Sequence, residues 1–512
     1  MKRSDKTPDD WAVLLEEFER RKAQAHTMGG PDKLAKRAAS GRRNAREMIE
    51  LLADPGSFME LGTLVGGHSY HGEPPVPADA LVAGLATVDG RTVVVGCEDF
   101  TVGGGSIGHG TAAKRMRLAR LAHQERCPLI MMLDGAGARA TNALERHPYA
   151  PNDLQELAAL SGLVPTVALV LGSSAGHGVL TGLLMDFVIA LENATLFAAG
   201  PPLVQAALGE KVSKEELGAA TMHARESGVV HNIVQDEEQA CRLIRQYLAF
   251  LPANAWEYPP SRVEKKKDGE RRLDEILQVV PCNGRQAYDM RKVLRLLADH
   301  GDFLEFQPLY GTPLLTGFLR LGGQPCAFVA NQPAVLAGSI TAEAAEKAAH
   351  FLHLANAFHL PVIFLTDNPG IMSGTKAERE GTLRAAARMY LAQAKLTSPK
   401  LHVTLRKAFG FGSSLMGMNP FDQQTITLAF PGISLGGLPA GGGGNAAKLD
   451  DERKARLAEA VASGAWSTGD TMAFDEIIDP RDLRNALLRG LALSLGRRTE
   501  AAAPVRISGI QP

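Results

Sequence analysis

The chain carries the same pattern twice at one fixed spacing, and this repeat constrains its fold more than any other feature. Asp134 ends the segment LIMMLD, and Asp367, 233 positions later (367 − 134 = 233), ends the similar segment VIFLTD. A period this long indicates a duplicated domain, because the repeats of solenoid proteins run at about 20 to 50 residues. The other pairs at this spacing are Gly90 and Gly323, Gly105 and Gly338, Ser106 and Ser339, Ala112 and Ala345, Lys114 and Lys347, Ala122 and Ala355, Pro128 and Pro361, Ile130 and Ile363, and Gly137 and Gly370.

Each half also shows the same succession of elements. DPGSFMEL begins at Asp54, and DHGDFLEF begins at Asp299, 245 positions later (299 − 54 = 245). Two β-rich segments then flank a tight turn, DG in the first half and GG in the second, which is typical of a β-hairpin. A Gly-rich loop that opens a helix and a buried strand follow. Strands that alternate with helices predict an α/β fold with both faces of each sheet covered.

The boundary between the halves is marked by composition. The segment from Pro252 to Arg272 is rich in proline and charge, as linkers between domains are. We therefore expect one domain in residues 1–265 and a second in residues 266–512.

Composition narrows the class of protein. With 512 residues, 45% hydrophobic content and a net charge of −1, the chain can form two cores and has no basic excess for nucleic acid. It has no apolar run of the ~20 residues that a membrane helix needs, and its start, MKRSDKTPDDW, has no apolar signal core. Its five cysteines are scattered without a C-x-x-C pair, so neither a metal site nor a disulfide framework is expected. We expect a cytoplasmic protein without membrane or nucleic-acid partners.

Glycines follow the strands of both halves, where α/β folds place their ligands. Glycine lets a substrate approach the main chain closely. Two backbone N–H groups aimed at one point form an oxyanion hole, which suits negative charge that develops on a thioester or amide oxygen. Asp134 and Asp367, at the strand ends, are either bases or caps of the turns that follow them.

A series of motifs, in matching order over nearly the whole chain, resembles the carboxyltransferase β subunits of biotin-dependent acyl-CoA carboxylases. This family includes the propionyl-CoA, acetyl-CoA and methylcrotonyl-CoA carboxylases and related decarboxylase subunits. The resemblance implies two homologous crotonase-like (ClpP/crotonase) β-β-α spiral domains, in agreement with the repeat. The motifs are GGPDKLAKRAASGRRNAREMIELLADPGSFMELG, GGGSIGHG, LDGAGAR, LGSSAGHGV, ANQPAVLAGSI, TDNPGIMSGT, RKAFGFGSSLMG and FDEIIDPRDLR.

The resemblance also implies a mechanism. Carboxybiotin releases CO2, the freed ureido nitrogen removes the acyl α-proton, and the enolate attacks CO2. The cofactor therefore supplies the base, while the protein supplies electrostatics and position. By resemblance, the amino-terminal domain binds acyl-CoA, and the amides of Gly176 and His177 face the thioester oxygen. The carboxyl-terminal domain binds biotin, and the amides of Phe411 and Gly412 face the ureido oxygen.

Further residues are assigned by the same resemblance. Lys114 is a candidate for contact with a CoA phosphate, although a lysine on an exposed helix is usually just solvated, and Ser414 matches a position that sets acyl size. Gly370 is expected to contact biotin, and no metal is expected. The substrate-binding set is Gly105, Ser106, Lys114, Gly137, Ala138 and Ser414.

The expected partners follow from the family and from missing motifs. The chain has no Met-Lys-Met biotinylation motif and no ATP-binding signature such as GxxxxGK[ST]. Biotin is therefore expected on a separate carrier domain or subunit, together with a biotin carboxylase. The resemblance implies a homo-hexamer built as a trimer of dimers.

Several residues depart from the family pattern, which usually has glycine at the positions of His177 and Phe411. His177 is a satisfied structural histidine, a residue that contacts substrate or reshapes the acyl pocket, or the mark of a site that has lost activity. His109 either begins a helix or contacts phosphate or pantetheine. The segment SLGGLPAGGGGNAA favours a mobile loop. Three functions stay open: a carboxylase subunit, a decarboxylase subunit, and a non-catalytic partner of an active β subunit.

Overall fold

The computed structural model describes residues 10–67, 75–145, 152–262, 269–419, 422–496, 498, 501–505 and 510. It divides into two compact units. The first comprises Met1–His223 and Ile233–Arg245, and the second comprises Ala224–Asn232 and Gln246–Pro512. The domain boundary predicted between residues 265 and 266 lies outside the described residues.

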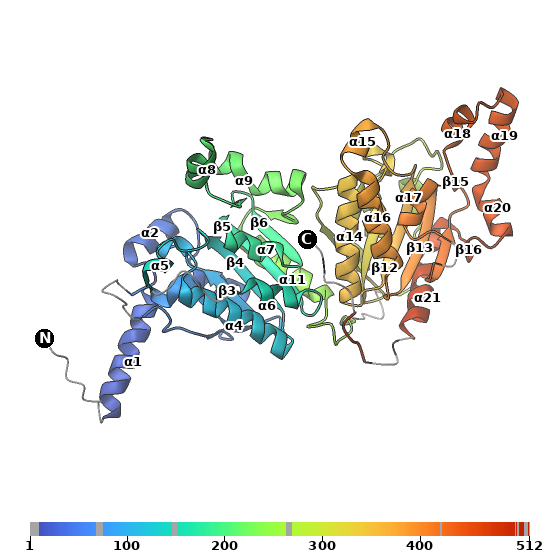
Figure 1. Ribbon diagram of the computed structural model, residues 1–512. Coiled ribbons are helices and arrows are strands. Elements are labelled where there is room, and N and C mark those ends of the chain that lie inside the picture. Colours follow the sequence, from blue (N-terminus) through green and yellow to red (C-terminus); the bar gives the residue numbers. More distant parts are fainter. Residues whose placement is uncertain are drawn as a thin grey trace. The chain divides into compact units, whose positions relative to one another are not determined.

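The first unit is built on an eight-stranded sheet (Figure 1). Its strands follow the order β1-β2-β3-β4-β5-β6-β8, and β7 pairs with β5. β2 and β3 form the predicted antiparallel hairpin, and β3 to β6 pair in parallel. The strands are β1 (Met59–Glu60), β2 (Leu81–Val88), β3 (Arg91–Glu98), β4 (Leu129–Gly135), β5 (Thr166–Ala175), β6 (Phe187–Leu191), β7 (Thr195–Phe197) and β8 (Asn232–Val234).

The second unit repeats this plan strand for strand. Its eight-stranded sheet has the order β16-β14-β13-β12-β11-β10-β9, and β15 pairs with β13 as β7 pairs with β5. β10 and β11 form the hairpin, and β11 to β14 pair in parallel. The duplication and the α/β class predicted from the sequence are confirmed. The strands are β9 (Phe303–Phe306), β10 (Leu314–Leu321), β11 (Gln324–Asn331), β12 (Val362–Asn368), β13 (Lys400–Phe409), β14 (Gln424–Ala429), β15 (Ser434–Gly436) and β16 (Glu476–Ile477).

Helices connect and cover the strands in both units (Figure 1). In the first half of the chain they are α1 (Trp11–His26), α2 (Pro31–Ala39), α3 (Ala45–Leu52), α4 (His109–Glu125), α5 (Asn142–Glu145), α6 (Leu154–Leu160), α7 (His177–Leu183), α8 (Pro201–Leu208), α9 (Lys214–Gly218), α10 (Ala220–Met222) and α11 (Glu237–Phe250). In the second half they are α12 (Ile276–Val279), α13 (Met290–Leu297), α14 (Ala342–Ala357), α15 (Thr375–Arg379), α16 (Thr382–Ala394), α17 (Gly410–Leu415), α18 (Ala440–Ala446), α19 (Asp451–Ala462), α20 (Gly464–Asp470) and α21 (Leu483–Leu495).

One aspartate holds the hairpin turn in each unit, which explains the echo at a spacing of 245. Asp54 accepts the N–H of Gly90 at 2.8 Å, and Asp299 accepts the N–H of Gly323 at 2.7 Å. Asp299 also pairs with the buried Arg484 of α21 at 2.5 Å. Because the carboxylate accepts the N–H of the turn glycine in each unit, this position favours aspartate in both halves.

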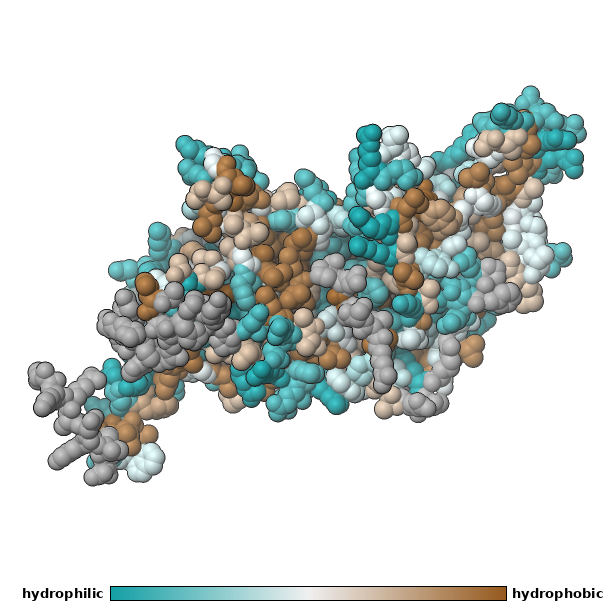
Figure 2. Space-filling view, in the orientation of Figure 1, coloured by the Kyte–Doolittle hydropathy of each residue, from teal (hydrophilic) through white to brown (hydrophobic). Residues whose placement is uncertain are grey.

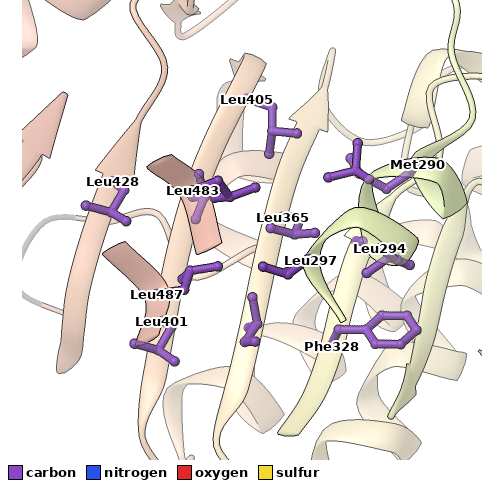
Figure 3. Packing of buried hydrophobic residues seen from close by; sticks show 14 of the residues in the cluster. Met290, Leu294, Leu297, Phe328, Leu365, Leu401, Leu405, Leu428, Leu483 and Leu487 are labelled. Atoms are coloured by element: carbon purple, nitrogen blue, oxygen red, sulfur yellow. The ribbon is translucent and has the colours of Figure 1, made fainter. Parts of the chain in front are cut away.

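Hydrophobic side chains fix the second sheet against α13 and α21 (Figure 3). Met290, Leu294 and Leu297 recur at helical spacing and are fully buried, so one face of α13 packs on the sheet. Full burial of one such side chain is worth roughly 1.5 to 3 kcal/mol. This packing holds the strands whose ends carry the glycine turns. The other labelled members of this cluster are Phe328, Leu365, Leu401, Leu405 and Leu428 from the strands and Leu483 and Leu487 from α21.

The segment SLGGLPAGGGGNAA is not the loop that its glycines favoured. It forms β15 and then α18, which contains the glycine run. A Cβ added to Gly443 would lie 3.3 Å from Leu438, and one added to Gly444 would lie 3.0 Å from the Lys454 side chain on α19. The missing side chains therefore let α19 approach α18 closely, and packing overrides the low helix propensity of glycine.

Candidate functional site

The turn that follows β5 places two backbone amides at the start of α7. Gly176 adopts a φ of 55°, a left-handed conformation that costs a residue without a Cβ little. His177 and Gly178 then form the first turn of α7, where a helix offers its amides no carbonyl partner. Neither amide donates a hydrogen bond within the described residues. Both N–H groups are thus available to an anionic oxygen.

The prediction that the Gly176 amide forms the hole is wrong. This N–H donates to the carbonyl oxygen of Phe197 in β7 at 3.1 Å. β5 and β7 pair in parallel up to this point, so the amide continues their hydrogen-bond ladder. The available pair in the first unit is therefore His177 and Gly178.

The second unit builds the same turn after β13. Gly410 adopts the same φ of 55° as Gly176, and Phe411 and Gly412 follow in the first turn of α17. Their amides also have no partner within the described ranges. The corrected first-unit pair stands 234 positions before this pair (411 − 177 = 234; 412 − 178 = 234). The Phe411 side chain is 51% exposed, so its ring does not fill the core beneath the turn.

Glycines let the neighbouring turns approach these helix starts. In the first unit the Ile107 amide donates to the Gly137 carbonyl at 2.7 Å, and Ile107 bridges to Ala138. A Cβ added to Gly137 would lie 2.6 Å from the Ala175 carbonyl oxygen. The turns after β3, β4 and β5 therefore meet, and they bring together the predicted residues Gly105, Ser106, Gly137, Ala138 and His177.

The corresponding turns of the second unit meet in the same way. Ile340 bridges to Ile371, and the Gly370 amide donates to the Asn368 side chain at 3.0 Å. A Cβ added to Gly412 would lie 2.8 Å from Gly370. The predicted residues Gly370, Phe411 and Gly412 thus lie together, and position 412 has no space for a side chain.

A pocket of about 1070 Å³ opens beside the Gly-rich turn of the first unit. Arg139 spans part of its wall, with Nη2 2.6 Å from the Asp79 carboxylate and Nε 3.2 Å from the Ser106 hydroxyl. Lys33 and His109 also line it. His109 begins α4, and its Nε2 lies 3.2 Å from the Asn142 carbonyl oxygen. The pocket therefore combines a glycine turn with cationic side chains.

Lys114 does not lie on an exposed helix face as predicted. Its side chain is buried, and its ammonium donates to the carbonyl oxygens of Ala78 at 2.8 Å and Leu81 at 2.7 Å. Burial lowers its pKa to about 8. Because its donors are directed at the turn before β2, we correct its expected position from the surface to the interior.

Its repeat partner, Lys347, has the same role in the second unit. Lys347 is 2% exposed and donates to the carbonyl oxygens of Gln307 at 3.2 Å and Tyr310 at 2.6 Å. Burial lowers its pKa to about 7. The lysine that recurs at the 233 spacing is therefore a buried residue whose ammonium holds two backbone carbonyls in each unit.

The strand-end aspartates are neither exposed bases nor caps of their turns. Asp134 is buried and pairs with Arg37 at 2.8 Å. Asp367 is fully buried, pairs with Arg406 at 2.7 Å and accepts the Tyr288 hydroxyl at 3.0 Å. Asp134 therefore ties the first sheet to α2, and Asp367 ties β12 to β13 and to the segment of Tyr288, which is a structural role in both units.

Ser414 lies in α17 with its hydroxyl turned toward a loop. Its Oγ lies 2.8 Å from the Asn419 side-chain oxygen, and its carbonyl accepts the Gln393 side chain at 3.0 Å. It shares a helix with Phe411 and Gly412, so the structure places it beside the second pair of amides.

Three segments match the G-x-S-x-G pattern of serine hydrolases, around Ser106, Ser174 and Ser434. The Ser106 hydroxyl donates to the Gly103 carbonyl at 2.7 Å, Ser174 is fully buried within β5, and Ser434 lies in β15. None of the three serines is hydrogen-bonded to a histidine or carboxylate among the described residues, as an activated nucleophile would be. The site therefore has no serine nucleophile of that kind.

A buried charged network that the sequence did not reveal joins α7 to β3, α4 and the start of α6. The His177 ring Nε2 is hydrogen-bonded to the Asp153 carboxylate. Asp153 pairs with Arg115 at 2.8 Å, and Arg115 pairs with Glu98 at 2.8 Å and also donates to the Thr181 hydroxyl. A comparison of the two halves would have marked Arg115 as a candidate functional residue, because its counterpart at the 233 spacing is the uncharged Ala348 (348 − 115 = 233).

The network keeps Asp153 ionised. Burial by itself raises the pKa of Asp153, but the hydrogen bond to His177 and the charge of Arg115 outweigh it, so this pKa lies below its ordinary value. Burial raises the pKa of Glu98 despite its pairing with Arg115. The His177 ring therefore has a specific carboxylate partner.

The described part of the chain contains no cluster of His, Cys, Asp and Glu side chains that could hold a metal ion. Within the same residues, no helix is both long and apolar enough to cross a membrane.

Comparisons with known proteins agree with this geometry. The carboxyl transferase domain family matches residues 36–505. The chain is 32% identical to the methylmalonyl-CoA decarboxylase subunit alpha of Veillonella parvula, over 94% of this chain and 95% of that one. It is 35% identical to the propionyl-CoA carboxylase beta chain of Saccharopolyspora erythraea, over 98% and 96%. A crystal structure of the transcarboxylase 12S hexamer with methylmalonyl-coenzyme A and methylmalonic acid bound matches with a TM-score of 0.89 and 29% identity, over 99% of this chain and all of that one.

These matches define the class of enzyme. Paired sheets of this order, each with a glycine turn before a helix start, are crotonase-like domains, and the fold expected from the resemblance is confirmed. The chain belongs to the carboxyl transferase domain family, as a carboxyltransferase of the biotin-dependent acyl-CoA carboxylases.

Proposed function

We propose that the chain moves a carboxyl group between biotin and the α-carbon of an acyl-CoA, with the acyl-CoA at the first unit and biotin at the second. The observation that carries this proposal is the matched pair of helix starts, His177 with Gly178 and Phe411 with Gly412. In both units these amides have no partner within the described residues. Two such pairs suit a reaction that develops negative charge on an oxygen of each reactant.

In the first unit, the amides of His177 and Gly178 hold the thioester oxygen while the α-carbon loses a proton or a carboxyl group. Removal of one such donor typically costs about 2.7 to 4 kcal/mol of barrier. The adjoining pocket takes the CoA portion, and Lys33 and Arg139 supply positive charge for its phosphates.

In the second unit, Phe411 and Gly412 present their amides to the ureido oxygen of biotin, and Gly370 lies against Gly412 in the neighbouring turn. Position 412 has no space for a side chain, because a Cβ there would lie 2.8 Å from Gly370, so glycine lets the start of α17 lie against the turn of Gly370. Biotin, when bound, supplies the carboxyl group and the nitrogen that takes the α-proton.

We further propose a homo-hexamer, a separate chain that carries biotin together with a biotin carboxylase, and a cytoplasmic location. The transcarboxylase 12S relative forms a hexamer. Figure 2 shows hydrophobic residues along α1, where Trp11 is 76% exposed and Leu15 55%. Exposed apolar surfaces of this kind mark protein interfaces, so α1 supports assembly.

A decarboxylase subunit is a second candidate function. The methylmalonyl-CoA decarboxylase subunit alpha of Veillonella parvula covers nearly the whole chain. Decarboxylation uses the same two holes in the reverse direction, so the acyl-CoA site and the residues assigned to it are unchanged.

Proline substitution tests the holes directly. Proline is tolerated in the first turn of a helix, where its missing N–H would have no helical partner; His177 is the first residue of α7 and Phe411 the second of α17. We expect His177→Pro to lower carboxyl transfer from methylmalonyl-CoA to free biotin by about 10² to 10³-fold, whereas His177→Ala, which keeps the amide, retains transfer. Phe411→Pro and Phe411→Ala form the matched pair in the second unit. Equal transfer by the proline and alanine variants of both sites would contradict the proposal.

A further inference from the structure

We propose that the His177 ring is an acid–base group for the α-carbon of the bound acyl thioester. It would give the chain an activity that needs no biotin, the exchange of the α-proton of an acyl-CoA with solvent. The proposal rests on the proposed function, in which the thioester lies at the start of α7.

The geometry of the ring fits this role. Asp153 is fully buried and pairs with Arg115, so its ionised carboxylate only accepts hydrogen bonds and Nε2 of His177 carries the proton between them. Nδ1 is then the unprotonated nitrogen of the neutral ring, the arrangement in which a carboxylate orients a histidine base. Nδ1 makes no hydrogen bond within the described residues, and the side chain is 28% exposed.

The ring also lies close to the reacting atoms. It is joined through Cα and Cβ to the same amide nitrogen that we assign to the thioester oxygen. A thioester held at that amide has its α-carbon one bond from the carbonyl carbon. The base and the proton that it removes are therefore brought together by one residue.

The two units differ at this network, although they share the fold. Glu98 accepts the Asp134 amide at 2.9 Å, and its counterpart Asn331 accepts the Asp367 amide at 3.0 Å. A neutral acceptor therefore suffices for the backbone, and the charge of Glu98 is not required by the fold. The four corresponding pairs are Glu98 and Asn331, Arg115 and Ala348, His177 and Phe411, and Thr181 and Leu415.

A buried charged network is expensive to maintain, because desolvation of each ion costs several kcal/mol before pairing offsets it. The second unit folds without such charges at the matching positions, so stability does not explain them in the first. Perturbed titratable groups that end on a partly exposed histidine mark a candidate functional site, and here Glu98, Arg115 and Asp153 lead to Nε2 of His177. The ring that they orient, His177, is the group through which the network reaches the proposed substrate.

The proposed step balances without another reactant. Nδ1 removes the α-proton, the electron pair of the C–H bond forms the enolate, and its charge lies on the oxygen held by the His177 and Gly178 amides. The imidazolium exchanges its proton with water, and Nδ1 returns a solvent proton to the α-carbon. The product is the same thioester with hydrogen from solvent.

Propionyl-CoA in D2O, without biotin, tests the proposal by mass spectrometry. We expect the complete chain to incorporate deuterium at the α-carbon, and we expect His177→Gln to lower the rate by about 10²-fold or more, the usual contribution of general acid–base catalysis. Asp153 is a positioning residue, so Asp153→Asn should lower the exchange rate while the Kd for propionyl-CoA, measured by calorimetry, stays unchanged. His123→Gln, at an exposed histidine of α4, is the control and should exchange like the wild type.

The outcomes separate the two proposals. Exchange that His177→Gln abolishes, with the Kd retained, supports the role of the ring. Binding of propionyl-CoA by the wild type without exchange, or exchange that is unchanged in His177→Gln, overturns this inference and leaves the proposed function intact. Failure of the wild type to bind propionyl-CoA overturns the assignment of the acyl-CoA site itself.

Discussion

Replacement of Arg115 by methionine should destabilise the first unit by about 3 to 5 kcal/mol, the usual cost of removing one partner from a buried ion pair. The side chains of Arg115 and Glu98 are each 1% exposed, and that of Asp153 is 0% exposed. Both N–O distances are 2.8 Å. Methionine has a similar shape and leaves little cavity, so the loss comes from two carboxylates that keep no cation.

The effect of this substitution should depend on pH in a known direction. Without Arg115, the pKa values of Glu98 and Asp153 in the folded chain rise above their unfolded values of about 4. A group with a raised folded pKa contributes stability below its unfolded pKa and loses that contribution as the pH rises through the folded value. The difference from the wild type should therefore be large near neutral pH and small near pH 4.

A triple variant provides the matched control. Combining Arg115→Met with Glu98→Gln and Asp153→Asn removes all three charges, as the second unit does at two of these positions. Replacement of a whole buried ion network by neutral groups is often nearly neutral for stability. Urea unfolding followed by circular dichroism, with hydrogen exchange to locate the change in the first unit, measures all variants. A loss below about 1 kcal/mol for Arg115→Met, or an equal loss in the triple variant, would refute the reasoning.

Three further outcomes follow from the repeat. Burial lowers the pKa of Lys347 from 10.5 to about 7, so between these pH values the unfolded chain binds more protons than the folded chain. The free energy of unfolding of the wild type, measured by urea unfolding, should therefore rise with pH across this window, and Lys347→Met should reduce that rise. Gly412→Ala should cost about 1 to 3 kcal/mol by overpacking and slow carboxyl transfer, whereas Gly432→Ala, with nothing within 4 Å of the new Cβ, should do neither. Asp299→Ala should lower the melting temperature more than Asp54→Ala, because their side chains are 3% and 28% exposed; equal shifts would count against buried pairing as the cause.

The sequence predicted the fold because its signals are local and occur twice. Apolar strands, hairpin turns and glycines before helices recur at one spacing, and each needs only neighbouring residues to be recognised. Gly176, just before α7, and Gly410, the first residue of α17, illustrate this, since both adopt a φ of 55°. The family resemblance then pointed to the helix starts that the structure brings beside the other glycine turns.

Long-range contacts explain what the sequence missed. The Gly176 amide is taken by Phe197, which reaches it only through the pairing of β7 with β5. Lys114 is buried because a turn 36 positions earlier in the chain presents the carbonyl of Ala78 to its ammonium. The partner of His177, Asp153, begins a different helix. None of these contacts produces a periodic pattern in the sequence. Only residues that differ between the two halves could have indicated them.

A crystal structure with a non-reactive acyl-CoA thioester analogue measures the central claim most directly. Productive oxyanion holes place their donors about 2.7 to 3.1 Å from the oxygen. We predict that the oxygen of the analogue lies at this distance from the backbone nitrogens of His177 and Gly178. A thioester bound away from the start of α7, with these two amides facing only solvent, would contradict the claim.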